Sequence, residues 1–318
     1  MAIQFIRTIT EFHELRGLPK SKHPLISLIN FADVKYKTQQ QDDVQLSFAF
    51  YSISVKKGME HKYKYGEQEY EFDFNDGTMF FMAPNQVLKV KSPVNGVRPS
   101  GWMLMIHPDF IWNTSLATTI HQHDFFEYSV NEALFLSEDE ELNMILLLQN
   151  IKKEYEAAID QFSQNIIISQ IETLLNYSQR YYQRQFITRK KVNHTILSQL
   201  DQLLNQRIHS AELSEKGNLT VQFLCDELHI SPSYLRSLLK NLIGKTPQEY
   251  IHIKLIDKAK EKLSTSTLSV GEIAYELGFE FPQSFSKLFK KYTKQTPMEF
   301  RAGFNTFVKT PQISKGMQ

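Results

Sequence analysis

Gly244-Lys245-Thr246-Pro247-Gln248-Glu249-Tyr250 is the stretch that decides the fold of the C-terminal part of this chain, because a variant of it occurs a second time. The second copy is Lys294-Gln295-Thr296-Pro297-Met298-Glu299-Phe300, fifty residues further along. Each copy follows an apolar and basic segment, which is Leu238-Leu239-Lys240 in the first case and Leu288-Phe289-Lys290 in the second. A repeat of this kind predicts two copies of one small structural unit, presenting similar surfaces at a fixed separation.

The residues before each copy extend the repeat and predict a short helix, a tight turn and a second helix. Leu224-Cys225-Asp226-Glu227-Leu228 aligns with Ile273-Ala274-Tyr275-Glu276-Leu277. In the second copy Ser269-Val270-Gly271-Glu272 predicts a capping box, and Gly278 stands where the helix needs a residue that tolerates positive φ. In the first copy Ser231-Pro232 predicts an N-cap followed by proline at the first helical position. This order is typical of a helix-turn-helix unit.

The second helix of each unit is expected to have one apolar face and one polar face. Its apolar residues follow the i, i+3, i+4, i+7 spacing of a buried stripe, namely Leu235, Leu238, Leu239 and Leu242 in the first copy and Phe285, Leu288, Phe289 and Tyr292 in the second. The polar residues that remain are expected to face outward, and none is acidic: Ser233, Arg236, Ser237 and Lys240, then Gln283, Ser284, Ser286, Lys287, Lys290 and Lys291. Side chains of these types bond base edges and phosphates, so two such faces in register favour DNA contact over a merely solvated basic helix face.

Separate roles can be assigned to these residues. Base readout is assigned to Ser233 and Arg236 in the first unit and to Gln283, Ser284 and Lys287 in the second. Phosphate anchoring is assigned to Lys240, Lys290 and Lys291 and to the helix N-termini at Thr246 and Thr296. Between the units, residues 246–263 predict a helix of roughly 25 Å, at ~1.5 Å per residue. Such a helix could place both second helices on one face of DNA, near the ~34 Å turn of successive major grooves.

Residues 218–302 resemble the DNA-binding domain of AraC/XylS-type transcriptional regulators, over about a quarter of the chain. The stretches that carry the resemblance are Ser231-Pro232-Ser233-Tyr234-Leu235, Gly244-Lys245-Thr246-Pro247-Gln248-Glu249-Tyr250, Leu268-Ser269-Val270, Glu272-Ile273-Ala274-Tyr275-Glu276-Leu277-Gly278-Phe279, Phe285-Ser286-Lys287-Leu288-Phe289-Lys290-Lys291 and Thr296-Pro297-Met298-Glu299-Phe300-Arg301. The resemblance implies a sequence-specific DNA-binding activator or repressor. One departure has a structural consequence: Lys294 stands where the second copy usually has glycine, so either this lysine is strained or the turn takes a different path.

Composition divides the chain into two halves of opposite charge. Residues 187–318 contain 19 Lys and Arg against 12 Asp and Glu, a net charge of +7, whereas residues 1–186 contain 17 against 23, a net charge of −6. A basic C-terminal half fits DNA contact confined to one end of the chain. The only cysteine, Cys225, excludes an internal disulfide and fits a reducing compartment. With no signal peptide and no stretch of membrane-spanning length, a soluble cytoplasmic protein without a membrane partner is expected.

The N-terminal half alternates apolar and polar residues in short runs, which predicts a sandwich or a small barrel. Strands are predicted over residues 46–55, 70–74, 78–82, 86–91 and 102–106, with a hairpin turn at 75–77. The resemblance implies a cupin-like β-barrel here, binding an effector. Aromatic residues could line a pocket in it, although most are expected to be plain core: Phe48, Phe50, Tyr51, Phe72, Phe74, Phe80, Phe81 and Trp102.

A metal site or an enzyme is the competing interpretation of this half. His121-Gln122-His123-Asp124 has two histidines one residue apart, which could chelate a metal from a strand, but the stretch is more typical of a solvated polar loop. We find no catalytic triad, phosphate loop or carboxylate pair, so no catalytic residue, metal ligand or cofactor is predicted. The alternatives that stay open are a barrel enzyme or metal-binding cupin with a regulatory DNA-binding tail, and a scaffold whose repeats bind protein.

Two helices are predicted after these strands. Ser137-Glu138-Asp139-Glu140 is a capping box that starts the first, which continues to about Ile159. The second is apolar over a broad arc, so it is expected to pack on the N-terminal domain and on a partner chain, with pure intrachain packing as the alternative. The residues assigned to dimerisation are Ile168, Ile171, Leu175 and Tyr182.

The sequence therefore predicts an α+β chain with three parts and a tail. These are a cupin-like sensor or effector domain over residues 1–136, a helical dimerisation and linker segment over 137–187, and an all-α AraC-type DNA-binding domain with two helix-turn-helix units over 188–305; residues 306–318 form the tail. The predicted partners are double-stranded DNA at an operator or promoter, a small-molecule effector, a second copy of the chain, and RNA polymerase if the protein is an activator. The effector, the operator and the choice between activation and repression stay open.

Overall fold

The computed structural model describes residues 3–34, 44–57, 63–65, 68–70, 77–90, 100–129, 132–157, 160–209 and 219–307. No helix within these ranges is long and apolar enough to cross a membrane. The chain forms two compact units. The first combines Met1–Lys190 with His229–Asn241, and the second combines Lys191–Leu228 with Leu242–Gln318. His229–Asn241 contains most of the second helix of the first repeat, which is predicted to contact DNA. The predicted boundary at residue 188 assigns this helix to the DNA-binding domain, whereas in the structure it belongs to the first unit.

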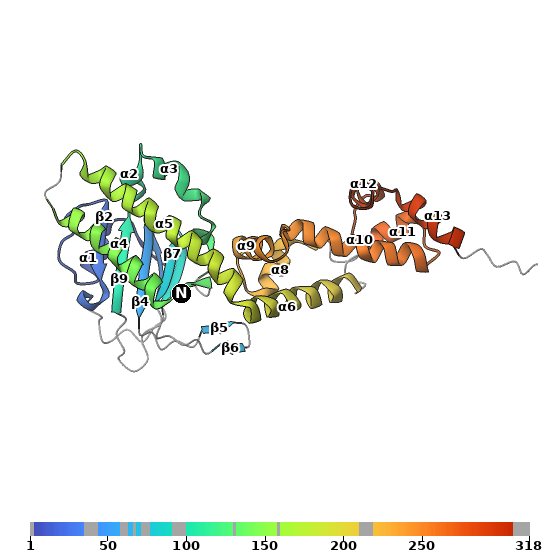
Figure 1. The fold of residues 1–318 in the computed structure, drawn as a ribbon, viewed down its shortest axis with the longest axis horizontal. Helices are drawn as coiled ribbons and strands as arrows, with labels where there is room; N and C mark the ends of the chain where they lie inside the picture. The colour runs from blue at the N-terminus through green and yellow to red at the C-terminus, as the bar shows by residue number, and fades with distance from the viewer. Residues whose placement is uncertain are drawn as a thin grey trace, which may run out of the picture. The chain divides into compact units, whose positions relative to one another are not determined.

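Five antiparallel strands form the main sheet of the first unit, in the order β10-β7-β4-β9-β2 (Figure 1). Their bounds are Leu134–Phe135 for β10, Thr78–Met82 for β7, Tyr51–Lys57 for β4, Ser100–Ile106 for β9 and Ile26–Asn30 for β2. In the central strand β4, Ile53 pairs with Phe81 on one side and with Leu104 on the other. All three side chains are buried, so the middle of this sheet belongs to the core.

A second sheet has three strands in the order β1-β3-β8, and it shares a core with the first. β1 (Ile3–Ile6) runs parallel to β3 (Val44–Phe48), which pairs antiparallel with β8 (Val87–Val90). The shared core joins Ile6 and Phe48 of this sheet to Ile29, Met103 and Met105 of the other. β5 (Tyr63–Tyr65) and β6 (Gln68–Tyr70) form a separate pair. Over the described residues the strands therefore form separate sheets, as in a sandwich, and do not close into the barrel that the resemblance implied.

The predicted strand over residues 46–55 is two strands, β3 and β4. The chain leaves β3 after Phe48, where the Ala49 N–H donates to the Ile6 carbonyl at 3.0 Å. The rings of Phe48 and Phe50 stack with 5.1 Å between their centroids, and both are buried. One stretch of alternating apolar residues and serines thus supplies a strand to each sheet. The predictions for 78–82, 86–91 and 102–106 correspond to β7, β8 and β9, whereas most of 70–77, including Phe72 and Phe74, lies outside the described residues.

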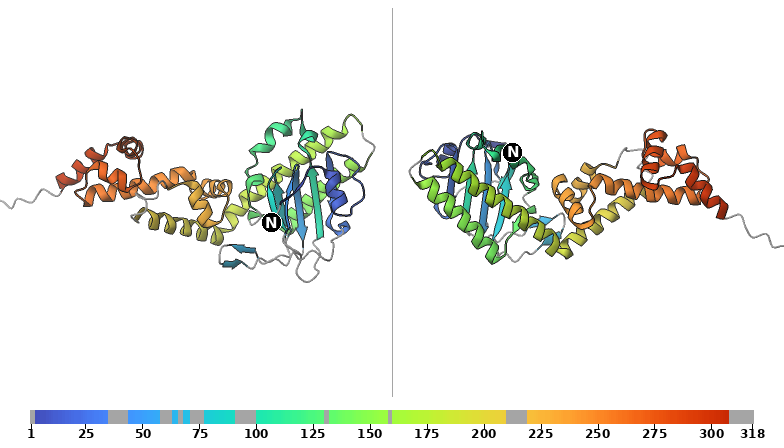
Figure 2. Two further views of the ribbon diagram at one scale, coloured as in Figure 1. Left: turned by 180° about the vertical axis from the view of Figure 1, so that it is seen from behind. Right: turned by 45° about the horizontal axis from the view of Figure 1, so that its top comes forward.

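Two long helices, α4 (Glu138–Glu156) and α5 (Ser163–Thr188), lie side by side across one face of the five-stranded sheet (Figures 1 and 2). The predicted capping box starts α4, because Ser137 and Glu140 exchange side-chain-to-backbone hydrogen bonds. Shorter elements surround the sheets: α1 (Ile9–Leu15), η1 (Phe31–Asp33), α2 (Pro108–Ile111), α3 (Ser115–Thr119), η3 (Ile120–Gln122) and η4 (Asp124–Glu127). His121 and His123 lie in and directly after the single-turn helix η3, so they do not have the strand geometry that a chelating pair was expected to use.

The four residues assigned to dimerisation are covered within the chain. Ile168, Ile171, Leu175 and Tyr182 are 4%, 0%, 0% and 2% exposed. The ring of Tyr182 stacks on Phe125 with 5.5 Å between centroids, and its hydroxyl donates to the Glu132 carbonyl at 3.2 Å. Intrachain packing, which the sequence left open, accounts for this face of α5, and none of the four side chains is accessible to a partner chain in this structure.

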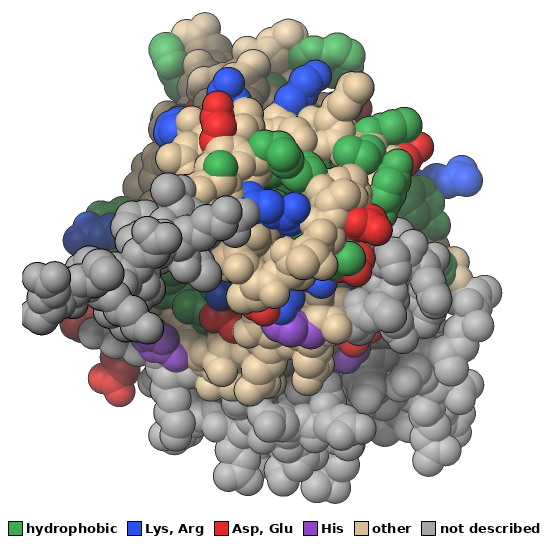
Figure 3. Space-filling model, turned by 90° about the vertical axis from the view of Figure 1, so that its right-hand side faces the viewer, with side chains coloured by type: hydrophobic (Ala, Val, Ile, Leu, Met, Phe, Trp, Pro, Cys, Tyr) green, Lys and Arg blue, Asp and Glu red, His purple; other side chains and the backbone are tan. Residues whose placement is uncertain are grey.

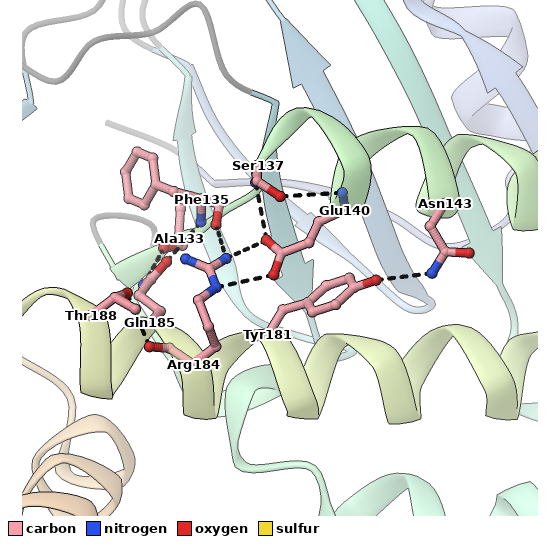
Figure 4. A network of polar contacts seen from close by, with 9 residues as sticks. All are labelled: Ala133, Phe135, Ser137, Glu140, Asn143, Tyr181, Arg184, Gln185 and Thr188. Atoms are coloured by element: carbon pink, nitrogen blue, oxygen red, sulfur yellow. Dashed lines mark hydrogen bonds and ion pairs between the residues drawn. The ribbon is translucent and has the colours of Figure 1, made fainter.

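A polar network ties β10 to α5 and α4 (Figure 4). Arg184 on α5 donates to the Phe135 carbonyl at 2.7 Å and forms an ion pair with Glu140. Gln185, next along the helix, donates to the Ala133 carbonyl at 3.1 Å and accepts from the Phe135 N–H at 2.8 Å. The strand is therefore held at the edge of the sheet by two consecutive side chains of one helix.

The remaining helices follow the predicted repeat along the chain. They are α6 (Lys190–His209), α8 (Val221–Leu228), α9 (Pro232–Ile243), α10 (Pro247–Thr265), α11 (Val270–Glu276), α12 (Pro282–Thr293) and α13 (Pro297–Phe307). The predicted capping boxes are present at Thr246 and Ser269. Gly278 has φ 77°, as expected, and His229 takes the matching position in the first copy with φ 54°. Lys294 has φ 65°, so of the two paths that the sequence left open for this turn the chain uses the strained lysine.

Candidate nucleic-acid interface

In the second unit, α12 has the two faces that its sequence predicted. Phe285 and Phe289 are fully buried, and their rings pack against Phe279 and Phe300 respectively. The opposite face is polar and exposed over two turns of the helix, and it consists of Gln283, Ser284, Lys287, Lys290 and Lys291. This arrangement supplies amide, hydroxyl and ammonium donors on one side of a rigid helix, as base and phosphate contacts require.

Ser286 differs from the other polar residues assigned to α12. It is only partly exposed, and its hydroxyl donates to the Pro282 carbonyl one turn earlier at 3.0 Å. That bond uses the hydroxyl proton within the helix. Two exposed apolar residues near this helix were not singled out by sequence reasoning: Phe281, directly before it, is 59% exposed, and Tyr275 on α11 is 54% exposed. The sequence offered one signal for the exposure of Phe281, which is its place in the predicted turn before the second helix.

The helix N-termini at Thr246 and Thr296 already carry carboxylates. Glu249 accepts a hydrogen bond of 2.9 Å from the Thr246 N–H, and Glu299 accepts one of 2.7 Å from the Thr296 N–H. These backbone bonds are the largest cause of the lowered pKa of both glutamates. A phosphate approaching either N-terminus would meet an ionised carboxylate, so Thr246 and Thr296 are the weakest of the predicted anchors.

On α9, the predicted residues divide into two pairs. Arg236 and Lys240 are exposed, as expected for DNA contact. Ser233 is 4% exposed, contrary to the expectation that it faces outward, and its hydroxyl donates to the Glu127 carboxylate. Ser237 is half-buried and donates to Oδ2 of Asp124 at 3.2 Å. These contacts lie within the first unit, which includes His229–Asn241.

The start of α9 is held by a buried carboxylate that the sequence analysis did not identify. Glu132 accepts hydrogen bonds from both the N–H and the hydroxyl of Ser231, each at 2.6 Å. Burial raises the pKa of Glu132 to about 7, although the bonds from Ser231 and Ser129 lower it. Burial also raises the pKa of Tyr234, the next aromatic residue on α9. No local pattern marks Glu132, since it lies in a polar stretch between predicted elements.

Basic side chains do not form one continuous patch on the face of the molecule seen in Figure 3. Lys and Arg side chains occur there in separate groups, with uncharged and acidic side chains between them (Figure 3). On this face the basic side chains are therefore distributed among uncharged and acidic ones. Contact with nucleic acid would depend on the placement of particular side chains more than on bulk attraction.

Comparison with known proteins gives matches to the C-terminal part of the chain. Residues 224–303 match a family model described as a helix-turn-helix domain. The raffinose operon transcriptional regulatory protein RafR of Pediococcus pentosaceus is 38% identical over 82 residues, which are 26% of this chain and 30% of that protein. The xylose operon regulatory protein of Escherichia coli (strain K12) is 30% identical over 115 residues, which are 36% of this chain and 29% of that protein.

A solved structure, the C-terminal domain of the two-component response regulator yesN from Fusobacterium nucleatum, is 33% identical. It covers 32% of this chain and 96% of its own, with a TM-score of 0.28. The chain thus spans about a third of the length of the curated relatives it matches.

The repeated order of short helix, turn and second helix, together with the family match, defines the C-terminal part of the chain as a double helix-turn-helix domain. Within that class it is an AraC-type DNA-binding domain, as the resemblance predicted.

Proposed function

We propose that this protein is a sequence-specific DNA-binding transcription regulator whose N-terminal unit senses a small-molecule effector. The observation that carries the proposal is the exposed polar face of α12, on which we assign Gln283, Ser284 and Lys287 to bases and Lys290 and Lys291 to phosphates. It lies in the part of the chain that matches operon regulators. Exposed Arg236 and Lys240 on α9 supply the corresponding contacts of the first repeat, together with Ser233 and Ser237 once these are uncovered.

A nuclease footprint of the purified protein tests this function. The probes are the DNA upstream of its own gene and fragments selected from duplexes of random sequence. We expect a protected tract spanning two successive major grooves per subunit, because each repeat supplies one recognition helix. Weak binding without protection of any fragment, and without a sequence preference, would contradict the proposal.

The proposal also includes the cellular location of the protein and its protein partners. We place the protein in the cytoplasm, as a homodimer that contacts RNA polymerase where it activates transcription. Because the inner face of α5 is covered, the dimer contact is proposed on the exposed apolar residues Leu142 and Leu146 of α4, which are one helical turn apart and 58% and 50% exposed. Sedimentation of the Leu142→Glu, Leu146→Glu variant tests this contact, since a dimer that survives both charges does not use that face.

A cupin-like assignment of residues 1–136 stays a prediction, and so does an effector that binds there. Relatives that match the chain are named as transcriptional regulators, so an enzyme is the weaker alternative. A scaffold that binds protein through its repeats is distinguished by a complete lack of salt-sensitive DNA affinity.

A further inference from the structure

Equivalent positions in the two repeats have opposite exposure. On α12 the residues at the start of the polar face are exposed: Gln283, Ser284 and Lys287. The α9 residues fifty positions earlier are covered, since Ser233 and Tyr234 are 4% and 7% exposed and Ser237 is half-buried. Both helices have twelve residues and a buried apolar stripe at the same positions. The helix alone therefore does not determine this difference, and a packing partner in the first unit must cover α9.

The residues that cover α9 come from one short stretch of the first unit, and we call them the acidic cover: Asp124, Glu127, Tyr128 and Glu132. Each carboxylate accepts from a different serine. Glu132 accepts two hydrogen bonds of 2.6 Å from Ser231, and Glu127 accepts from the Ser233 hydroxyl. Along α9 the third contact lies one turn further on, where Asp124 accepts from Ser237 at 3.2 Å.

Aromatic packing completes the contact. The ring of Tyr234 meets Tyr128 edge-on with 5.3 Å between centroids, and it meets Phe186 of α5 at the same distance. Tyr234 therefore anchors α9 in an apolar site between the acidic cover and α5. Such pairs contribute beyond their buried area, so the contact is more than a set of surface hydrogen bonds.

The serine hydroxyls that donate to the acidic cover are also the groups assigned to DNA contact. A serine hydroxyl donates one hydrogen bond, whether the acceptor is a carboxylate, a phosphate oxygen or a base acceptor. While Ser233 and Ser237 donate to carboxylates, they cannot donate to DNA. The cover also places the carboxylates of Glu127 and Asp124 against the face of α9 that is assigned to DNA, where they would repel a phosphate backbone. Arg236 and Lys240 stay exposed beside it.

We propose that the acidic cover is an intramolecular competitor for DNA, which withholds the reading face of α9 until it is released. This inference rests on the proposed function and adds how that function is controlled. In the covered state only the second repeat presents its complete polar face, so binding is weak and centred on α12. Release of α9 makes both faces available.

The fold holds the acidic cover in place at two points. Within its stretch of chain, the Phe126 carbonyl accepts a hydrogen bond of 2.5 Å from the side chain of Gln86, which lies between β7 and β8. After this stretch, Gln185 and Arg184 of α5 bond the carbonyls of Ala133 and Phe135 (Figure 4). A ligand that shifts α5 or the sheet edge would therefore move the cover relative to α9. Ligand binding to the N-terminal unit could in this way change how much of α9 is exposed.

The test compares two full-length variants with the same change of charge. Asp124→Ala, Glu127→Ala removes two acceptors of the cover and leaves the buried Glu132 and Tyr128 in place. Glu138→Ala, Asp139→Ala is the matched control, because both carboxylates are exposed in the first turn of α4 and neither contacts α9. The probe is a pool of short duplexes of random sequence, followed by the fragments that the protein selects from it. Circular dichroism confirms that both variants fold.

We expect the cover variant to bind selected fragments about tenfold more tightly than the control, as it would if the covered state is occupied about nine-tenths of the time. Amide hydrogen exchange should become faster in α9 and stay unchanged in α12, which is the internal reference. Equal affinities of the two variants would overturn the inference while leaving the proposed function intact. Lack of sequence-selective binding by the wild type and both variants would overturn the proposed function, and this inference with it.

Discussion

Ser231 donates two hydrogen bonds to Glu132, from its N–H to Oε1 and from its hydroxyl to Oε2, each 2.6 Å long. The N–H of Ser129 adds a third bond of the same length to the same carboxylate. Loss of hydration outweighs these bonds and raises the pKa of Glu132 to about 7. The protonation state of one buried carboxyl therefore influences how firmly the start of α9 is held.

Stability should fall as pH rises through neutrality because of Glu132. Its pKa in the folded chain lies above the usual 4.5, so the folded chain binds a proton that the unfolded chain has lost. This contribution is fully present below about pH 4.5 and is lost as pH rises through about 7. Tyr128, Tyr182 and Tyr234 face the same carboxyl, and their raised pKa values keep them neutral over this range.

Urea unfolding of the wild type and of Glu132→Gln at pH 5 and pH 8 measures this effect. The stability of the wild type relative to the variant should be lower at pH 8 by about 2 kcal/mol. Other titrating groups cancel in this difference. A difference that is the same at both pH values would show that Glu132 does not titrate in this way.

Arg236→Ala should relax the preference for one base pair. Arg236 is exposed on α9, where a guanidinium can bond a guanine edge with two parallel hydrogen bonds. We expect a loss of ~1–3 kcal/mol at selected sites and little loss on random DNA. Competition binding with single-base variants of the selected site measures both. Unchanged discrimination at every position would show that the reading face of α9 is wrongly assigned.

Lys290→Ala should weaken binding to all sequences alike. Lys290 is exposed in the last turn of α12, where it is assigned to a phosphate. The slope of log affinity against log salt concentration should become smaller by about one. Lys262→Ala is the control, because Lys262 pairs with Glu276 at 2.6 Å and is not assigned to DNA. Equal slopes for the two variants would exclude the phosphate contact.

Lys294→Gly should stabilise the second repeat. Lys294 has φ 65°, whereas the matching residue of the first repeat, Gly244, has φ 67° without strain. A side chain in this left-handed region costs roughly 1 kcal/mol. The replacement should therefore raise the free energy of unfolding by somewhat less than that, about 0.5 kcal/mol, because glycine also loosens the unfolded chain.

Gly244→Ala is the complementary variant. No atom lies within 4 Å of an added Cβ, so its cost of about 1 kcal/mol comes from the backbone alone. Chemical unfolding of both variants measures the pair, and opposite signs are expected. The Lys294 ammonium group donates to the Lys291 carbonyl at 3.2 Å, so a destabilising Lys294→Gly would show that this exposed bond outweighs the backbone strain.

Much of the C-terminal domain could be predicted because its determinants are local. The capping boxes at Thr246 and Ser269 join residues three positions apart, and the buried stripe of α12 repeats every three or four residues. Each of these signals is complete within one or two helical turns. The exposed face of α12, with Gln283 and Lys287, follows from the same periodicity.

Sheet organisation in the N-terminal unit was predicted less well. A run of alternating residues identifies a strand but not the sheet in which it pairs, so residues 46–55 were predicted as one strand although they leave one sheet at Phe48 and enter another at Tyr51. The broad apolar arc of α5 likewise showed that Ile168 and Leu175 are buried, but not what buries them. Pairing and packing depend on partners far away in the chain.

The sequence by itself determined the repeat, its helices, their caps and their apolar stripes, because helix formation and capping depend on residues within a few positions of one another. Only the tertiary structure decided which of the two predicted polar faces is partly covered. Ser233 and Gln283 occupy equivalent positions, and one is buried while the other is not. The carboxylate that holds the start of α9 lies 99 residues before Ser231, and no local pattern can report a contact over that distance.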